Sequence, residues 1–132
     1  MSFLLDANTC IQYLNGRSDR IRQHLEAVQP RDVVLCSVVK AELFYGALKS
    51  ARTAENLARI EAFAGRFASF PFDDAAAAVY GEVRARLERQ GTPIGPNDLL
   101  IAAIALARGT TLVTHNTREF GRIEELRLED WE

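Results

Sequence analysis

Three carboxylates stand where the neighbouring residues are apolar. Asp98 precedes a long apolar run in the stretch GTPIGPNDLLIAAIALARG, and Asp6 interrupts the apolar segment FLLDAN. Glu42 belongs to a helical pattern, VVKAELFYGALKS, in which the positions one turn away are mostly apolar. A buried carboxylate without a partner costs several kcal/mol. Each of these acids therefore needs a capping role, a cation or a chemical task.

A cluster of the three acids predicts a divalent metal ion. At a separation of about 5 Å and an effective dielectric constant of about 20, each pair would repel by about 3 kcal/mol. The total of about 10 kcal/mol is as large as the stability of a whole domain. Such a cluster must retain protons or bind a cation, and oxygen ligands favour Mg²⁺ or Mn²⁺. The expected reaction is metal-assisted hydrolysis of a phosphodiester.

Each acid also has a purely structural interpretation. Asp98 could complement a helix dipole, Asp6 could cap the helix that follows the first strand, and Glu42 could pair with an arginine. Among the other acids, Asp73 and Asp74 are expected to cap a helix.

Polar residues follow a strand expected over residues 110–114. Thr114 ends this strand, and Asn116 and Glu119 lie in the loop just after it. A hydroxyl at the carboxyl end of a strand is well placed to hold a carboxylate or a water molecule. Thr114 could equally be an ordinary strand residue.

Strands and helices alternate along the chain. Short apolar strands are expected at residues 3–6, 32–37 and 110–114, an extended piece at 67–73 and an edge strand near 126–131. Helices are expected at 7–15, 38–50, 53–67, 74–90 and 99–108. This order predicts one α/β domain over residues 1–132, with a mainly parallel central sheet and helices on both faces. Ligands of such sheets bind beyond the carboxyl ends of the strands.

Composition limits the choice of partners and compartment. The net charge of −2 argues against indiscriminate nucleic-acid binding, although 14 of the 16 basic residues are arginine and several are grouped in the sequence. Those groups could contact phosphates or lie on solvated helix faces. No apolar stretch is long enough for a membrane span or a signal peptide, so a soluble cytoplasmic protein is expected.

Cysteine and histidine chemistry is not expected. Cys10 and Cys36 lie in apolar segments and are expected to be free, buried thiols. The two histidines, His24 and His115, do not fall in a ligand cluster, so each is expected to be a surface or packing residue.

Four blocks of sequence resemble the PIN-domain ribonuclease toxins of the VapC type. The blocks are FLLDANTCI, VVKAELFYGALKS, GTPIGPNDLLIAAIALARG and LVTHNTREFGRI, followed by LRLEDW, and they span essentially the whole chain. The resemblance implies a three-layer PIN-like fold and an Mg²⁺- or Mn²⁺-dependent endoribonuclease. It also implies homodimerisation and inhibition by a VapB-type antitoxin, for which the LFYGAL stretch could line a groove.

The resemblance places the acids of the family on Asp6, Glu42, Asp98 and Glu119. The first three are expected to bind the metal, with Thr114 and Asn116 as polar supports. Many relatives have aspartate at the fourth position, so the longer Glu119 is expected to position a ligand or water. His115 replaces an asparagine that is frequent in close relatives.

The segments CIQYL, GTPIGP and TREF resemble the subgroup that cuts initiator tRNA in its anticodon loop. Two other classes remain open. A receiver-type signalling domain has a similar length and acids at strand ends, but it needs a lysine after a late strand, and the last lysine here is Lys49. A PIN-like module without catalysis could act by binding RNA or protein alone.

Overall fold

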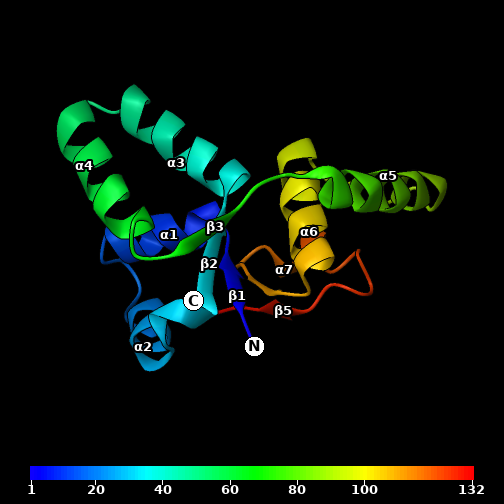
Figure 1. Ribbon diagram of the computed structural model, residues 1–132, viewed down its shortest axis with the longest axis horizontal. Coiled ribbons are helices and arrows are strands. Elements are labelled where there is room, and N and C mark those ends of the chain that lie inside the picture. The colour runs from blue at the N-terminus through cyan, green and yellow to red at the C-terminus, as the bar shows by residue number, and fades with distance from the viewer.

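The computed structural model describes all 132 residues and contains a five-stranded sheet in which every strand pair is parallel. The strand order is β3-β2-β1-β4-β5 (Figure 1). The strands are β1 (Phe3–Leu5), β2 (Val33–Cys36), β3 (Ala68–Phe70), β4 (Thr111–Val113) and β5 (Leu128–Glu129). The prediction of a mainly parallel α/β sheet is confirmed, and the expected edge strand near the C-terminus is β5.

Helices lie on both sides of the strands. In Figure 1, α1, α3 and α4 lie on one side of the central strands, and α5, α6 and α7 lie on the other. The helices are α1 (Ala7–Leu14), α2 (Asp19–Ala27), α3 (Ser37–Lys49), α4 (Thr53–Ala64), α5 (Asp74–Arg89), α6 (Pro96–Arg108) and α7 (Thr117–Phe120), with a 3₁₀ turn at Pro30–Asp32. None of these helices is long and apolar enough to cross a bilayer.

The hydrophobic core forms because the central strands and α6 bury side chains on all of their faces. All four residues of β2 are buried, and so are the residues from Ile101 to Ala105 in α6. Both free cysteines, Cys10 and Cys36, are buried in this core, as expected. Burial raises the pKa of both thiols, which keeps them protonated and unreactive.

The strand order changes direction between β1 and β4. From β1 the chain continues to β2 on one side, whereas β4 pairs with the opposite edge of β1. In open parallel sheets, ligands bind at the carboxyl ends of the strands where the order changes direction in this way. The residues that follow Leu5 and Val113 are therefore the ones to inspect.

Several element boundaries differ from the sequence predictions. Helix α2 was not expected, because only Ile21 and Leu25 of its residues are buried and the apolar signal is weak. Helix α4 ends at Ala64, before the expected residue 67. Helix α6 begins at Pro96 and not at residue 99, since proline is tolerated in the first turn of a helix.

Two acids cap α5 as expected, with the roles divided between them. Asp73 is the N-cap residue, and its side chain accepts a 3.0 Å hydrogen bond from the backbone N–H of Ala76. Asp74 is the first helical residue, where a negative charge complements the helix dipole.

Candidate active site

Asp6 follows β1 directly and is held by two hydrogen bonds. Its Oδ1 accepts from the backbone N–H of Ala7 at 2.8 Å, and its Oδ2 accepts from the Thr114 hydroxyl at 2.8 Å. The side chain is also the N-cap of α1, so the expected capping role is confirmed. Burial raises the pKa of Asp6, and the two hydrogen bonds oppose this shift. The capping role does not exclude a second role, because Oδ2 points away from the helix toward β4.

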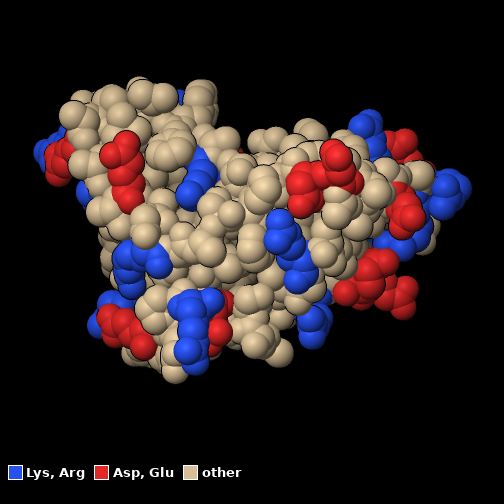
Figure 2. Space-filling view, viewed as in Figure 1, with Lys and Arg blue, Asp and Glu red and all other residues tan.

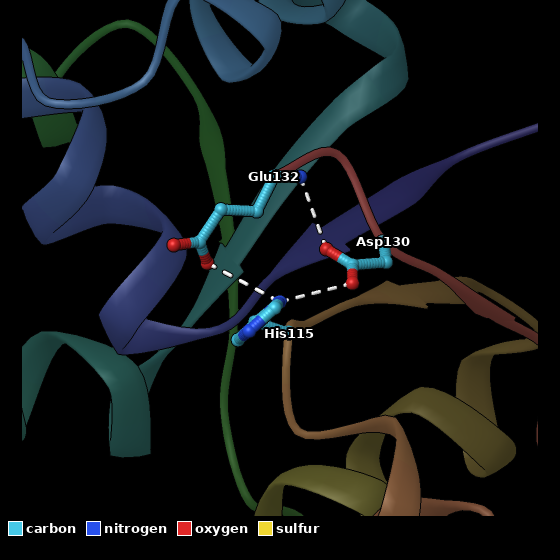
Figure 3. Close-up of side chains that lie close together, drawn as sticks. All are labelled: His115, Asp130 and Glu132. Atoms are coloured by element: carbon cyan, nitrogen blue, oxygen red, sulfur yellow. Dashed lines mark hydrogen bonds and ion pairs between the residues drawn. The ribbon is translucent and has the colours of Figure 1, made fainter.

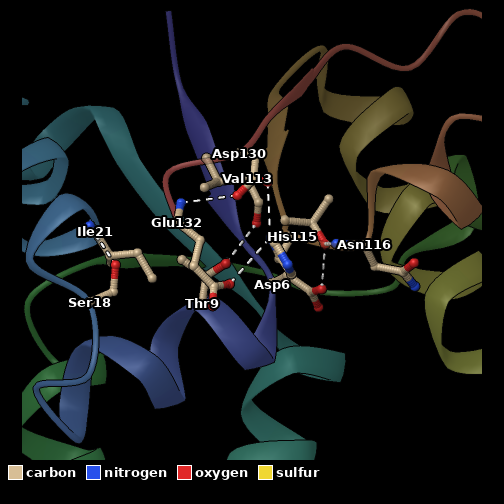
Figure 4. Close-up of polar contacts among 10 residues, drawn as sticks. Asp6, Thr9, Ser18, Ile21, Val113, His115, Asn116, Asp130 and Glu132 are labelled. Carbon is tan, nitrogen blue, oxygen red and sulfur yellow. Dashed lines mark hydrogen bonds and ion pairs between the residues drawn. The ribbon is translucent and has the colours of Figure 1, made fainter.

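Thr114 and Asn116 connect the end of β4 to the acids. Thr114 is fully buried, and its hydroxyl oxygen also accepts a 3.0 Å hydrogen bond from the backbone N–H of Asn116. Figure 4 shows Asp6, His115 and Asn116 together at this edge of the sheet. The Asn116 amide in turn donates a 3.0 Å hydrogen bond to Oε2 of Glu119. The loop after β4 therefore holds two acids, Asp6 through Thr114 and Glu119 through Asn116.

Glu42 lies in the second turn of α3 and is half-buried. Burial raises the pKa of Glu42, and the negative charge of Asp6 adds to the shift. The expected alternative of an ion pair with an arginine is wrong, because no cationic side chain lies within 4 Å of this carboxylate.

Among these acids, Asp98 has the most strongly shifted pKa. Its pKa is raised to about 7, first by burial and then by repulsion from Asp6, Glu119 and Glu42. Asp98 occupies the first turn of α6, where the helix dipole favours an ionised carboxylate. The net upward shift shows that burial and the neighbouring acids outweigh the dipole. Dipole complementarity alone therefore does not account for this residue.

Glu119 differs from the other acids because both of its oxygens have hydrogen-bond donors. Oε1 accepts a 2.6 Å bond from the backbone N–H of Gly95, and Oε2 accepts the bond from Asn116. These contacts lower the pKa of Glu119. A side chain at position 95 would approach both carboxylates, since a Cβ there would lie 3.4 Å from Glu119 Oε1 and 4.0 Å from Asp98 Oδ2. Glycine keeps this space open. Sequence reasoning missed the role of Gly95, although its place beside two prolines was a usable signal.

The donor set suits a hard divalent cation. Asp6, Glu42 and Asp98 present only oxygen atoms, and none of them has a cationic side chain within 4 Å. Burial raises the pKa of Glu42 and of Asp98, and repulsion from the neighbouring acids adds to both shifts. The three do not supply oxygens that all lie within 4.8 Å of one another. Mg²⁺ retains several water ligands and needs few direct protein contacts, so one or two of these acids would bind it directly and the rest through water.

Of the three acids, Glu42 lines two hollows on the surface. One hollow lies between α1, α3 and α4, and the other lies between α3 and α6. Figure 2 shows a notch between the two lobes that carry α3 and α6. A flexible ligand could therefore reach this edge of the sheet from outside.

Some of the grouped arginines pair with nearby acids. Arg84 pairs with Glu88 at 2.9 Å, and Arg86 pairs with Glu125 at 2.5 Å. On the face shown in Figure 2, basic and acidic side chains intermingle and no broad basic surface forms. The expectation that the net charge disfavours indiscriminate nucleic-acid binding agrees with this distribution.

The two histidines have different environments. His24 stacks on Trp131, with ring centroids 5.2 Å apart, so its expected packing role is confirmed. His115 is a surface residue, as expected, but it lies beside Asp130 and Glu132, and these three side chains could together hold a metal ion, which their sequence positions did not indicate. Sequence reasoning missed this group because parallel pairing of β4 and β5 brings its members together.

Known proteins resemble this chain over its full length. The tRNA(fMet)-specific endonucleases VapC of Salmonella typhimurium and Shigella flexneri are 42% and 44% identical to it over 131 residues, which cover 99% of this chain and 98% of each relative. The structure of DNA-bound VapBC from Salmonella typhimurium contains a chain with a TM-score of 0.94 and 42% identity, with 100% of this chain and 99% of that chain covered. VapBC2 from Rickettsia felis, bound to a promoter DNA fragment, gives a TM-score of 0.93 at 38% identity, with both chains covered completely.

A family model also matches most of the sequence. The model of the PIN domain matches residues 3–126. The alternative of a receiver-type signalling domain is therefore wrong. The chain belongs to the PIN-domain family and, within it, to the VapC ribonucleases.

Proposed function

We propose that this protein is the toxin of a VapBC-type toxin-antitoxin system and a metal-dependent endoribonuclease that acts in the cytoplasm. The observation that carries the metal dependence is the gathering of acids without a cationic partner: burial, and then repulsion from Asp6, Glu119 and Glu42, raises the pKa of Asp98 to about 7. The ribonuclease activity is supported by the names of relatives with 42% and 44% identity over nearly the whole chain.

Asp6, Glu42 and Asp98 would hold the ion. Bound Mg²⁺ or Mn²⁺ would supply an activated water and would neutralise the charge that develops on the phosphate. Thr114 keeps the Asp6 carboxylate oriented through the hydrogen bond to Oδ2. Asp98 must release its proton before it can act as an oxygen ligand, so cation binding is coupled to proton release.

Glu119 contributes through the backbone of the turn that precedes α6. It accepts the N–H of Gly95, the residue at which α6 is capped, and so fixes the start of the helix that carries Asp98. Arg122 holds the same turn from outside by donating a 2.6 Å hydrogen bond to the carbonyl of Pro93. We therefore assign Glu119 a positioning role.

We infer that the substrate is initiator tRNA, cut in its anticodon loop. Two relatives are named for tRNA(fMet), and single-stranded loops offer the splayed bases and accessible phosphates that proteins recognise in RNA. The hollow between α3 and α6 leads toward Glu42 and can admit such a loop. Arg118 is exposed on α7, next to Glu119, and is available for a phosphate contact.

We further infer that a VapB-type antitoxin inhibits the enzyme by covering the groove between α1, α3 and α4. The VapBC complexes from Salmonella typhimurium and Rickettsia felis show toxins of this fold with such partners. On α3, Leu43 and Ala47 line the groove, and Leu48 nearby is 62% exposed. Glu42 also lines this groove, so a bound segment would shield one of the three acids. The pairing of two toxin copies implied by the family remains part of this proposal.

Purified substrates test the proposed target. Antitoxin-free protein would be incubated in Mg²⁺ with initiator tRNA, with elongator methionine tRNA and with an anticodon stem-loop of the initiator sequence. We expect a single cut in the anticodon loop of the initiator tRNA and of its stem-loop. Equal cleavage of both tRNAs would contradict the specificity but keep the nuclease. Binding without cleavage would support the alternative of a PIN-like module that only binds RNA.

A further inference from the structure

Three potential metal ligands gather on the surface outside the acidic group of the active site. Figure 3 shows His115, Asp130 and Glu132 pointing toward one another. Nδ1 of His115 lies 3.0 Å from Oδ2 of Asp130 and 3.5 Å from Oε2 of Glu132. This is the only set of three histidine, cysteine or acidic residues whose ligand atoms all lie within 4.8 Å of one another.

These distances match the edges of a zinc coordination tetrahedron. Zn²⁺ binds nitrogen and carboxylate oxygen at about 2.0–2.1 Å, so neighbouring ligand atoms in a tetrahedral site are separated by about 3.3 Å. The two distances from Nδ1 of His115 fall on either side of this value. One imidazole with two carboxylates favours a borderline ion such as Zn²⁺ over Mg²⁺, which prefers oxygen ligands alone.

A buried tryptophan holds the two acids in place. Trp131 stands between Asp130 and Glu132, is 2% exposed, and packs its ring against Phe3 and His24. The backbone N–H of Glu132 donates a 3.0 Å hydrogen bond to Oδ1 of Asp130, which leaves Oδ2 facing the imidazole. The Asp130 carboxylate is therefore oriented by a backbone contact, and the packing of Trp131 anchors the segment that carries both acids.

The cluster also has excess negative charge and is open to solvent. Neither Asp130 nor Glu132 has a lysine or arginine within 4 Å, so even a protonated His115 would leave a net charge of −1 on the three side chains. The His115 side chain is 65% exposed, and those of Asp130 and Glu132 are 34% and 31% exposed. A divalent ion can therefore reach the group and compensate its charge.

We propose that His115, Asp130 and Glu132 form a Zn²⁺-binding site distinct from the acids of the active site, with its remaining coordination position open to water. The ion would tie the segment after β5 to the loop after β4. That loop supports the active site on both sides of His115, through Thr114 to Asp6 and through Asn116 to Glu119. Zn²⁺ would therefore stabilise the carboxyl edge of the sheet. This inference is independent of the proposed function.

Calorimetric titration with Zn²⁺ tests the site. Millimolar Mg²⁺ is present throughout, because it competes with Zn²⁺ for the oxygen ligands of Asp6, Glu42 and Asp98. The titration would use the full chain carrying Asp98→Asn, which further weakens Zn²⁺ binding at the active site. We expect one equivalent of Zn²⁺ to bind, with an affinity that falls at least about tenfold in His115→Asn and in Asp130→Asn. Asp19→Asn removes an exposed acid of α2 outside the cluster and is the control, so its Zn²⁺ affinity should be unchanged.

Thermal unfolding of the same proteins provides a second measurement. Zn²⁺ should raise the melting temperature of the parent chain and of Asp19→Asn, but not that of His115→Asn. Equal Zn²⁺ binding by His115→Asn and its parent would overturn the proposal and leave the cluster as an ion pair between a protonated histidine and two acids. The absence of saturable binding to the parent chain would overturn it as well.

Discussion

The Thr114 hydroxyl donates a 2.8 Å hydrogen bond to Oδ2 of Asp6, and this contact joins residues 108 positions apart in the chain. It links the carboxyl ends of β4 and β1, the two neighbouring strands at which the strand order changes direction. Both residues are buried, so the carboxylate has little water to replace a lost donor. The state of Asp6 therefore depends on Thr114.

Replacing Thr114 with valine should make Asp6 harder to ionise. The hydrogen bond lowers the pKa of Asp6, so its loss adds to the upward shift caused by burial. We expect the acidic limb of the cleavage rate to move to higher pH, and the free energy of unfolding to fall by about 1–3 kcal/mol. Thr114→Ser keeps the hydroxyl and should retain the pH profile. An unchanged profile in the valine variant would show that the contact does not control Asp6.

Asp98→Asn should stabilise the metal-free protein at high pH. The pKa of Asp98 is raised from 3.8 to about 7, so its stabilising contribution is complete below about pH 4 and is lost as the pH rises through 7. Asparagine at this position does not ionise, so the variant does not lose this stability as the pH rises. With allowance for solvent screening, the variant should be about 1 kcal/mol more stable than the parent at pH 8.

The pH dependence separates this effect from a general change in helix stability. Unfolding of both proteins in urea with a chelator should show a difference at pH 8 that disappears near pH 4. Asp19→Asn is the control, because Asp19 is an exposed acid in the first turn of α2. A larger difference at acidic pH than at pH 8 would mean that the sign of the shift is wrong.

Mg²⁺ should raise the melting temperature more at pH 8 than at pH 5. At the lower pH, Asp98 retains its proton, and a cation must displace it before the carboxylate can become a ligand. Scanning calorimetry at fixed Mg²⁺ across this range measures the effect, and Glu42→Gln should diminish it. A stabilisation that is independent of pH would place the ion elsewhere on the protein.

Replacing Glu119 and replacing Glu42 should affect folding and Mg²⁺ affinity differently. Both oxygens of Glu119 already accept hydrogen bonds, so Glu119→Ala should lower the melting temperature and the cleavage rate while the apparent Mg²⁺ affinity stays within about threefold. Glu42→Gln should lower the apparent Mg²⁺ affinity at least about tenfold with little effect on folding. Measuring the rate at a series of Mg²⁺ concentrations distinguishes the two. A large loss of Mg²⁺ affinity in Glu119→Ala would make Glu119 a direct ligand.

Much of the fold was predictable because strands and helices alternate with clear boundaries. The buried run of β2 and the apolar α6 carry strong signals, and the parallel sheet follows from their order. Helix α2 was not predictable, because only Ile21 and Leu25 bury apolar surface and polar residues fill the rest. The start of α6 at Pro96 was missed because proline also favours turns.

The candidate acids were predictable for a different reason. Asp6, Glu42 and Asp98 lie in apolar surroundings, and that conflict is visible in the sequence. The partners that decide their individual roles were not visible, since the contacts from Gly95 to Glu119 and from His115 to Asp130 join separate segments of the chain. Such contacts depend on strand pairing and on loop conformation, which local patterns do not determine.

Mapping the ends of tRNA fragments tests the central claim most directly. Purified protein, freed of any antitoxin, would be incubated with total tRNA in excess Mg²⁺ or in a chelator, beside Asp98→Asn in Mg²⁺. The proposed function predicts new ends in one anticodon loop, only in Mg²⁺ and only with the parent protein. Equal cleavage by Asp98→Asn, or equal cleavage in the chelator, would contradict a metal-dependent ribonuclease centred on Asp6, Glu42 and Asp98.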